Sequence, residues 1–518
     1  MKKYIQYIVA SCIFLISASC DPEFERAIED PGFYQAGEAN FGTVIAVGNS
    51  LTAGFADGAL YQLGQENSFP NILAKQIALI ERSDFSQPLV ADNIGGLILN
   101  GTQIADKRRV LTQDATGNLG TVKFIEGMPT TEVSTSLEGP FNNMGVPGAK
   151  SYHLLANGYG NVADIPTGTA NPYFARFAST PNASILEDAV ALDPTFFSLW
   201  IGNNDILSYA TSGGIGTDQT GNLDASSYGP NDITDPSVFA SIYQTVISTL
   251  TQNDVKGVVL NIPDVTSIPF FTTVPNNALV LSLENAANLT AAFQAVSGVF
   301  TQVLIQQGVS APQAQAIAAQ YAFTFNEGPN RLLIDVPVTD TNPLGIRQMS
   351  EKELLLLTID QAALGQGYGS IILNDQVLQV LGLLQQGGTP NTEQTQTLLS
   401  AVSGIKDEDV LDSNELVAIN TAQMAYNTTI QNLAMANNLA FFDVKSLLAQ
   451  AASSGIMTDA GLITSTFATG GAFSLDGVHP TARGYAIVTN GVIDAINAQY
   501  ESTIPKVNPS SFPTVYIE

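Results

Sequence analysis

The sequence predicts an α/β protein built on a parallel, doubly wound β-sheet. Five short apolar runs are each followed at once by turn residues, and an unbroken apolar run is typical of a strand that is covered on both faces. Segments with helical periodicity lie between the runs, and strands that alternate with helices favour a parallel sheet. The runs are residues 44–47, 141–146, 195–202, 257–262 and 439–444.

The first run ends in a sharp turn that carries a serine. In "AVGNSLTAG", Gly48 can adopt backbone angles that other residues avoid, and Ser50 follows two positions later. The end of a parallel strand lies at the carboxyl edge of the sheet, where open α/β sheets bind ligands. Ser50 is therefore either a helix cap or an exposed nucleophile.

Two of the intervening segments show a helical apolar face. Pro70 stands near the start of the first, and Asp412 with Glu415 predicts a capping box ahead of the second. The faces consist of Leu73, Ile77 and Ile80 in residues 67–80, and of Tyr426, Ile430 and Leu433 in residues 421–434.

Two regions interrupt the alternation. Residues 208–236 are rich in Gly, Asp, Ser and Thr and predict a loop. Residues 272–405 predict a helix-rich insertion, with helical stretches "LTAAFQAVSGVFTQVLIQQ" and "LLLLTIDQAAL". This insertion either covers or shapes the site, or it is a subdomain packed on the edge of the sheet. The α/β domain then consists of residues 41–271 and 406–500, followed by an irregular tail at 501–518.

The amino terminus predicts an exported lipoprotein. Lys2 and Lys3 precede an apolar run at 5–16 that is short for a membrane span, which is typical of a signal peptide over residues 1–19. The stretch "ISASC" resembles a lipoprotein cleavage box, so Cys20 is expected to carry the lipid, with residues 20–40 as a tether. The alternative is ordinary secretion with cleavage nearby. Only one thiol would remain in the mature chain, and acylation would account for it.

The predicted location is the outer membrane or cell surface of a bacterium. The acidic "DPEFE" after Cys20 resembles the export signal of surface lipoproteins in some Gram-negative bacteria. No later segment is expected to span a membrane, so the lipid on Cys20 would be the only anchor.

Charge excludes one class of partner. The chain has 518 residues, and its 19 Lys and Arg against 47 Asp and Glu give a net charge of −28. Nucleic-acid binding needs clustered basic side chains, so we expect no nucleic-acid partner. Two histidines and no spare cysteine offer too few ligands for a zinc site, so no metal is expected.

A nucleophilic Ser50 needs a base, and the chain offers only His153 and His479. His153 lies among leucines in "SYHLLANG", which is typical of a helix residue. His479 lies in the turn-rich "SLDGVHPTARG", where Asp476 can turn back to bind one ring nitrogen and leave the other to face Ser50. We therefore predict a triad of Ser50, Asp476 and His479.

Acyl transfer also needs donors for the oxyanion. "NNMGVPG" places Gly145 where a backbone N–H can approach closely, and "IGNND" places Asn204 where a side-chain amide can point into the same crevice. We expect both groups to serve as oxyanion donors.

These blocks resemble the SGNH (GDSL-type) lipases and esterases, in order and over nearly the whole chain. "GNSL", "NMGVPG", "GNND" and "DGVHP" match the family's four blocks, and "NIPDVTSIP" resembles its segment after the fourth strand. The resemblance implies an SGNH-hydrolase-like sheet with flavodoxin-like layering and two-step ester hydrolysis without a cofactor. It also implies an oxyanion hole made of the Ser50 and Gly145 N–H groups and the Asn204 amide. Asn49 departs from the family's usual Gly-Asp-Ser, which leaves the implied triad in place.

Three functions compete. The first is a lipase or esterase acting on acyl esters, and the second is a carbohydrate acetyl esterase using the same triad. The third is a noncatalytic surface lipoprotein that binds lipid or assists an outer-membrane protein.

Overall fold

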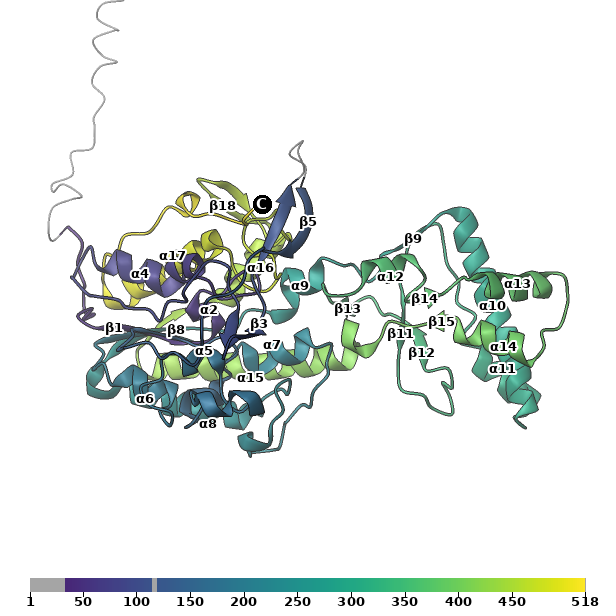
Figure 1. Cartoon of the computed structure of the whole chain (residues 1–518), viewed down its shortest axis with the longest axis horizontal. Coiled ribbons are helices and arrows are strands. Elements are labelled where there is room, and N and C mark those ends of the chain that lie inside the picture. The colour runs from purple at the N-terminus through teal and green to yellow at the C-terminus, as the bar shows by residue number, and fades with distance from the viewer. Residues whose placement is uncertain (1–32, 114–118, 518) are drawn as a thin grey trace, which may run out of the picture.

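The computed structural model describes residues 33–113 and 119–517, and its centre is a five-stranded, all-parallel sheet (Figure 1). Each predicted apolar run overlaps one strand, which confirms the α/β class. Counted along the chain, the spatial order is 2-1-3-4-5, a doubly wound order whose switch point lies between the first and third strands. The strands are β1 (Val44–Gly48), β6 (Asn143–Gly145), β7 (Phe196–Trp200), β8 (Lys256–Leu260) and β17 (Ala440–Phe442).

Helices cover both faces of this sheet, because alternate strand residues point to opposite sides. Val44, Phe196 and Val258 pack toward α4 (Phe69–Ile77) and α17 (Ala482–Tyr500). Their strand neighbours pack toward the helices on the other face: α6 (Ile185–Val190), α8 (Pro236–Leu250) and α15 (Ser413–Ala436).

Both predicted helical segments are found. Ser68 is the N-cap of α4, with Pro70 in its first turn. Asp412 and Glu415 form the predicted capping box of α15, each side chain accepting from the other residue's N–H.

Short helices and hairpins complete the α/β domain. The helices are α2 (Ser50–Ala53), α3 (Gln62–Glu66), α5 (Pro172–Ala175), α7 (Asn204–Thr211), α9 (Pro269–Thr272) and α16 (Val444–Ser453). The hairpins pair β2 (Leu97–Leu99) with β3 (Thr102–Ala105), β4 (Arg109–Gln113) with β5 (Leu119–Phe124), and β18 (Ile456–Thr458) with β19 (Gly461–Ile463).

Residues 272–405, here called the arm, project from the sheet domain and have a core of their own (Figure 1). That core includes Phe293, Val296, Tyr321 and Leu398. Its helices are α10 (Leu283–Gln306), α11 (Ala311–Ala319), α12 (Gln361–Gly365), α13 (Asp375–Gln385) and α14 (Thr392–Ser400). Its strands are β9 (Leu279–Leu281), β10 (Gly328–Asn330), β11 (Leu333–Asp335), β12 (Ile346–Gln348), β13 (Leu354–Leu355), β14 (Ser370–Ile371) and β15 (Val402–Ser403), with β16 (Val410–Leu411) at its base.

Three local predictions were wrong. The leucine run at 354–364 is not one helix: it forms β13, a turn and α12, because Leu354 and Leu355 pair with β16. The predicted loop at 208–236 begins inside α7. The expectation that no later segment suits a membrane span fails for α10, whose length and mean hydropathy of 1.3 meet that test, although it packs within the arm.

The predicted signal peptide and Cys20 lie outside the described residues. The described part of the tether docks on the end of α17, where the Glu38 N–H donates to the Tyr500 carbonyl at 2.7 Å. Residues 501–517 are irregular apart from η7 (Pro509–Ser511) and run back over the domain.

Candidate functional site

Ser50, His479 and Asp476 form a continuous hydrogen-bonded chain. The Ser50 Oγ lies 2.9 Å from His479 Nε2, and His479 Nδ1 lies 2.8 Å from Asp476 Oδ2. The structure thus brings together three residues from the two ends of the domain. The arrangement is the one in which an imidazole can take a proton from a serine hydroxyl while a carboxylate orients the ring.

Ser50 occupies the switch point of the sheet. It is the first residue of α2, directly after β1, and Asn203 and Asn204 follow the neighbouring strand β7. The chain leaves β1 toward one edge of the sheet and β7 toward the other, which opens a crevice between the two strand ends. Ser50 is therefore both a helix residue and a group in that crevice.

Gly48 is required for space rather than for its backbone angles. It does not have a positive φ, contrary to what the sequence analysis expected. An added Cβ would lie 2.2 Å from Thr52 Oγ1 and 2.4 Å from the Trp200 carbonyl oxygen. A side chain at this position would push α2, and with it Ser50, away from β7.

Asp476 is held by five donors. Its Oδ1 accepts from the N–H groups of Val478 and His479 and from the Ser474 hydroxyl, and its Oδ2 accepts from the Gly58 N–H as well as facing the His479 ring. Burial by itself raises the pKa of Asp476, but the His479 ring and these hydrogen bonds outweigh it and lower the pKa. The carboxylate is thus kept ionised beside the ring.

Asp57 braces the same loop from the α2 side. Its Oδ1 accepts from the Leu475 N–H at 3.0 Å, and its own N–H donates to Ser474 Oγ at 2.9 Å. Tyr61 donates its hydroxyl to the other carboxylate oxygen. Burial raises the pKa of Asp57 to about 6, and the nearby charge of Asp476 acts in the same direction.

Gly145 does not fit its predicted place in the oxyanion hole. Its N–H already donates to Asn143 Oδ1 at 2.9 Å, and the residue is buried at the end of β6. An added Cβ there would lie 2.3 Å from the Ala53 nitrogen, so this glycine serves close packing against α2.

Gly148, the next glycine along the chain, has a backbone N–H without a partner in the described chain. Pro147 and Gly148 occupy the middle of a turn that the Ala149 N–H closes onto the Val146 carbonyl at 3.0 Å. Gly148 has a φ of +82°, as the third position of a type II turn requires, and such a turn leaves its N–H unused. That N–H and the Ser50 N–H bond to no other part of the described chain.

Asn204 keeps its predicted place beside Ser50. It lines the same cavity as Ser50 and His479, and its side-chain amide donates one hydrogen to the Ala149 carbonyl at 2.9 Å. Because Ala149 follows Gly148, this bond places the amide next to the turn. The second amide hydrogen stays available.

Two further hydrogen bonds join the segment after β6 to the start of α7. The buried Asp205 carboxylate, next to Asn204, accepts from both the N–H and the hydroxyl of Ser151 at 2.8 and 2.6 Å. The segment after β6 and the start of α7 are thus linked by the bonds of both Asn204 and Asp205.

His153 is the structural histidine. Its Nδ1 accepts from the Lys150 N–H at 3.0 Å, and its ring stacks on Tyr159 with centroids 4.2 Å apart. Burial, helped by the charge of Lys150, lowers the pKa of His153 to about 3. It is held neutral in the 3-10 helix η1 (Ser151–Leu155) and makes no bond to Ser50.

Asn49 joins the two strand ends. Its Oδ1 accepts from the Leu51 N–H and caps α2, while its Nδ2 donates to Asn203 Oδ1 at 3.3 Å. A carboxylate could make the first bond but not donate the second. The departure from the Gly-Asp-Ser pattern thus has a partner on the neighbouring strand.

A small apolar cavity opens beside Ser50 and His479. Its volume is about 90 Å³, and its walls come from β7, the segment after β8, α16 and the start of α17. Trp200, Val444, Leu448 and Ile487 are among the residues that line it.

The arm touches the loop that carries Asp476 and His479 but does not line this cavity. The Phe270 N–H donates to the Gly477 carbonyl at 2.9 Å, and the Leu357 N–H donates to the Phe270 carbonyl at 2.8 Å. An added Cβ at Gly477 would lie 2.9 Å from Leu357 Cδ2. Of the two roles considered for the insertion, the contact supports shaping the site, since no residue of 272–405 lies over Ser50 in the cavity wall.

Within residues 33–113 and 119–517, no group of three or more His, Cys, Asp and Glu side chains is placed to hold a metal ion.

No family model, no characterised protein and no solved structure matches this chain.

Sequence reasoning missed four groups that build the site: Gly148, Gly58, Ser474 and Asp57. A signal existed for Gly148, because Pro-Gly marks a type II turn with an outward N–H. Gly58 and Asp57 lie more than 400 residues from Asp476 along the chain, and only the folded structure brings them to it.

Proposed function

We propose that this protein is a serine-dependent hydrolase of acyl esters, of the SGNH (GDSL-type) kind. The observation that carries the proposal is the chain of hydrogen bonds from Ser50 through His479 to Asp476, at 2.9 and 2.8 Å, beside an apolar cavity. Ser50, Gly148 and Asn204 each keep an N–H hydrogen that bonds to no other part of the described chain, and Asn204 lines the same cavity as Ser50.

The reaction would proceed in two steps. His479 takes the Ser50 proton as Oγ attacks the ester carbonyl, and the ring then gives that proton to the leaving alcohol. The N–H groups of Ser50 and Gly148 and the Asn204 amide stabilise the oxyanion. A water molecule, deprotonated by His479, then attacks the acyl-serine, and the acid leaves as Ser50 regains its proton.

The cavity beside Ser50 favours a short acyl chain. Its volume of about 90 Å³ is small against the roughly 300–1,000 Å³ of sites that enclose drug-sized ligands. The carbohydrate acetyl esterase alternative would place an acetyl group in the same cavity, with the sugar as the leaving alcohol, so both kinds of ester fit this acyl site.

A chain-length series of p-nitrophenyl esters tests the proposal. We expect the wild type to hydrolyse acetate to butyrate esters faster than decanoate or longer esters, and Ser50→Ala to lose turnover by roughly 10⁴-fold or more. The exposed Ser226→Ala is the control and should keep full activity. Turnover retained in purified, folded Ser50→Ala would contradict the proposal.

A lipid anchor on Cys20 at the outer membrane or cell surface belongs to the same proposal. It rests on residues 1–20 of the sequence alone. The net charge of −28 argues against a nucleic-acid partner.

A further inference from the structure

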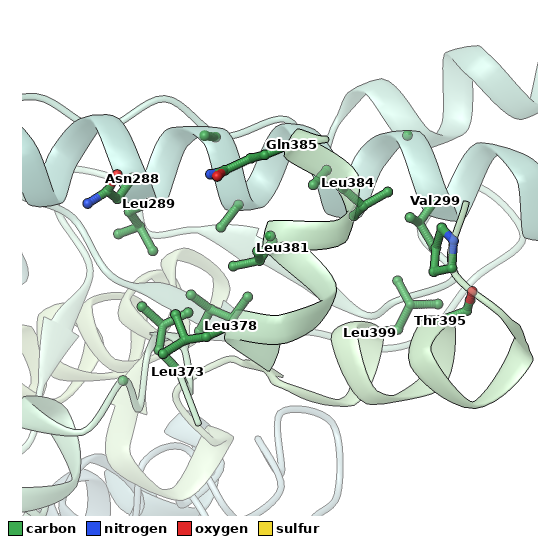
Figure 2. A pocket seen from close by; sticks show the side chains of 18 of the residues that line it. Asn288, Leu289, Val299, Leu373, Leu378, Leu381, Leu384, Gln385, Thr395 and Leu399 are labelled. Carbon is green, nitrogen blue, oxygen red and sulfur yellow. The ribbon is translucent and has the colours of Figure 1, made fainter. Parts of the chain in front are cut away.

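The arm contains a second hollow, separate from the site at Ser50. Its volume is about 1600 Å³, and it lies between α10 on one side and α13 and α14 on the other (Figure 2). This exceeds the roughly 300–1,000 Å³ of most small-molecule sites, so there is room for a long alkyl chain.

Leucines and amide side chains share the walls of this hollow. Figure 2 shows Leu289 of α10 across from Leu378 and Leu381 of α13, with Leu384 farther along the same helix. Leu373 and Leu378 both line the hollow and are 47% and 51% exposed. The walls therefore offer apolar surface that the described chain leaves in contact with water.

No lining residue carries an ionisable side chain. A charged ligand group inside the hollow would lose its hydration without gaining a counter-ion. The lining does include the amides of Asn288, Gln302 and Gln385, which bond to no other described residue. Such amides can bind the hydroxyl groups of an uncharged ligand.

Two glycines keep the hollow open. Gly298 lies inside α10 and Gly382 inside α13, where glycine is less stable than alanine. An added Cβ at either position would meet nothing within 4 Å, so neither glycine is needed for close packing. Both line the hollow, and a larger side chain at either would occupy it.

We propose that the arm binds a neutral lipid with one long alkyl or acyl chain and an uncharged, hydroxyl-bearing headgroup. A second copy of the chain is a poorer occupant, because each copy carries a net charge of −28 and the two would repel. The inference goes beyond the proposed hydrolysis, since Ser50, His479 and Asp476 take no part in this site.

The test uses the full chain and 1-O-hexadecylglycerol, a neutral ether lipid with no ester bond, below its aggregation concentration. Binding is measured by displacement of the neutral dye Nile red. The filling variant is Gly298→Leu with Gly382→Leu, and the matched control is Gly298→Ala with Gly382→Ala. Both pairs should fold, because each replaces helical glycine by a better helix former.

We expect saturable binding to the wild type, equal binding to Ser50→Ala, and affinity at least about tenfold lower in the leucine pair than in the alanine pair. Hexadecanoate and hexadecylammonium should bind at least about tenfold more weakly than the ether.

Equal affinity in the leucine and alanine pairs, absence of saturable binding, or tighter binding of a charged amphiphile would each overturn the proposal. Dimers of the wild type that the leucine pair abolishes, without ether binding, would instead make a second copy the occupant. If the wild type binds the ether but does not hydrolyse esters, the lipid site stands and only the proposed hydrolase is contradicted.

Discussion

At the scale of single residues, the candidate site depends on which side chains and N–H groups remain unengaged. Gly145 and Gly148 are three positions apart, yet only Gly148 has a free N–H. His153 and His479 likewise differ in their partners: one bonds to a backbone N–H and the other faces Ser50 and Asp476.

The two histidines give a matched pair for mutation. His479→Ala should lower kcat for ester hydrolysis by roughly 10⁴- to 10⁶-fold, about as much as Ser50→Ala, because triad residues act as a unit. His153→Ala should leave kcat nearly unchanged while lowering the thermal midpoint, since the ring stacks on Tyr159 in the core. Steady-state kinetics and circular dichroism check both. Near-normal turnover in folded His479→Ala would remove the base from the mechanism.

The raised pKa of Asp57 predicts that the free energy of unfolding depends on pH. Its pKa rises from 3.8 to about 6 on folding, so between these values the folded chain holds a proton that the unfolded chain has lost. The contribution of Asp57 to the free energy of unfolding therefore falls as pH rises from about 4 to 6, and stays low above that range.

Asp57→Asn removes this titration. Its free energy of unfolding should rise relative to the wild type between pH 4 and pH 6, by up to about 3 kcal/mol. Urea unfolding at pH 4, 5, 6 and 7 measures the difference, with the exposed Asp340→Asn as control. A wild-type-minus-variant difference that is the same at all four pH values would show that Asp57 does not titrate as described.

At the scale of elements, the sequence predicted best where burial is uniform. All five strands of the parallel sheet lie at the predicted runs, and β1 and β7 are buried at every residue, as strands covered on both faces are. The arm was predicted less well. Leu354 and Leu355 belong to a leucine run that was predicted to be helical, but they form a strand because they pair with Leu411 and Val410. That pairing spans more than 50 residues and leaves no local signal.

The turn after β6 carries its own prediction. Gly148 and Gly158 have the same φ of +82°, and both lie in open surroundings where an added Cβ would fit. Alanine at either should cost about 1 kcal/mol of stability, since L-residues disfavour this region. Only Gly148→Ala should also lower kcat, by roughly tenfold or more, because relaxation of the turn moves an oxyanion donor. An equal kcat in the two variants would show that Gly148 is not an oxyanion donor, which would leave Ser50 and Asn204 as the only proposed donors.

At the scale of the whole molecule, the sheet domain and the arm each contain a hollow, and the two differ in size. The sheet domain has a cavity of about 90 Å³ beside Ser50, and the arm has one of about 1600 Å³ between helices. The bond between Phe270 and Gly477 and the packing of Leu357 join the base of the arm to the loop that carries Asp476 and His479. The sequence indicated an insertion but gave no sign of this contact, which pairs residues more than 100 positions apart.

The central claim is that Ser50 is a nucleophile activated by His479. The most direct measurement is covalent labelling with a fluorophosphonate, followed by mass spectrometry of the peptides. We predict one phosphonyl adduct, on the Ser50 peptide, which is lost in Ser50→Ala, strongly slowed in His479→Ala and unchanged in His153→Ala. A wild type that hydrolyses esters while its adduct lies on another serine, or that is not labelled at Ser50 at all, would contradict the claim.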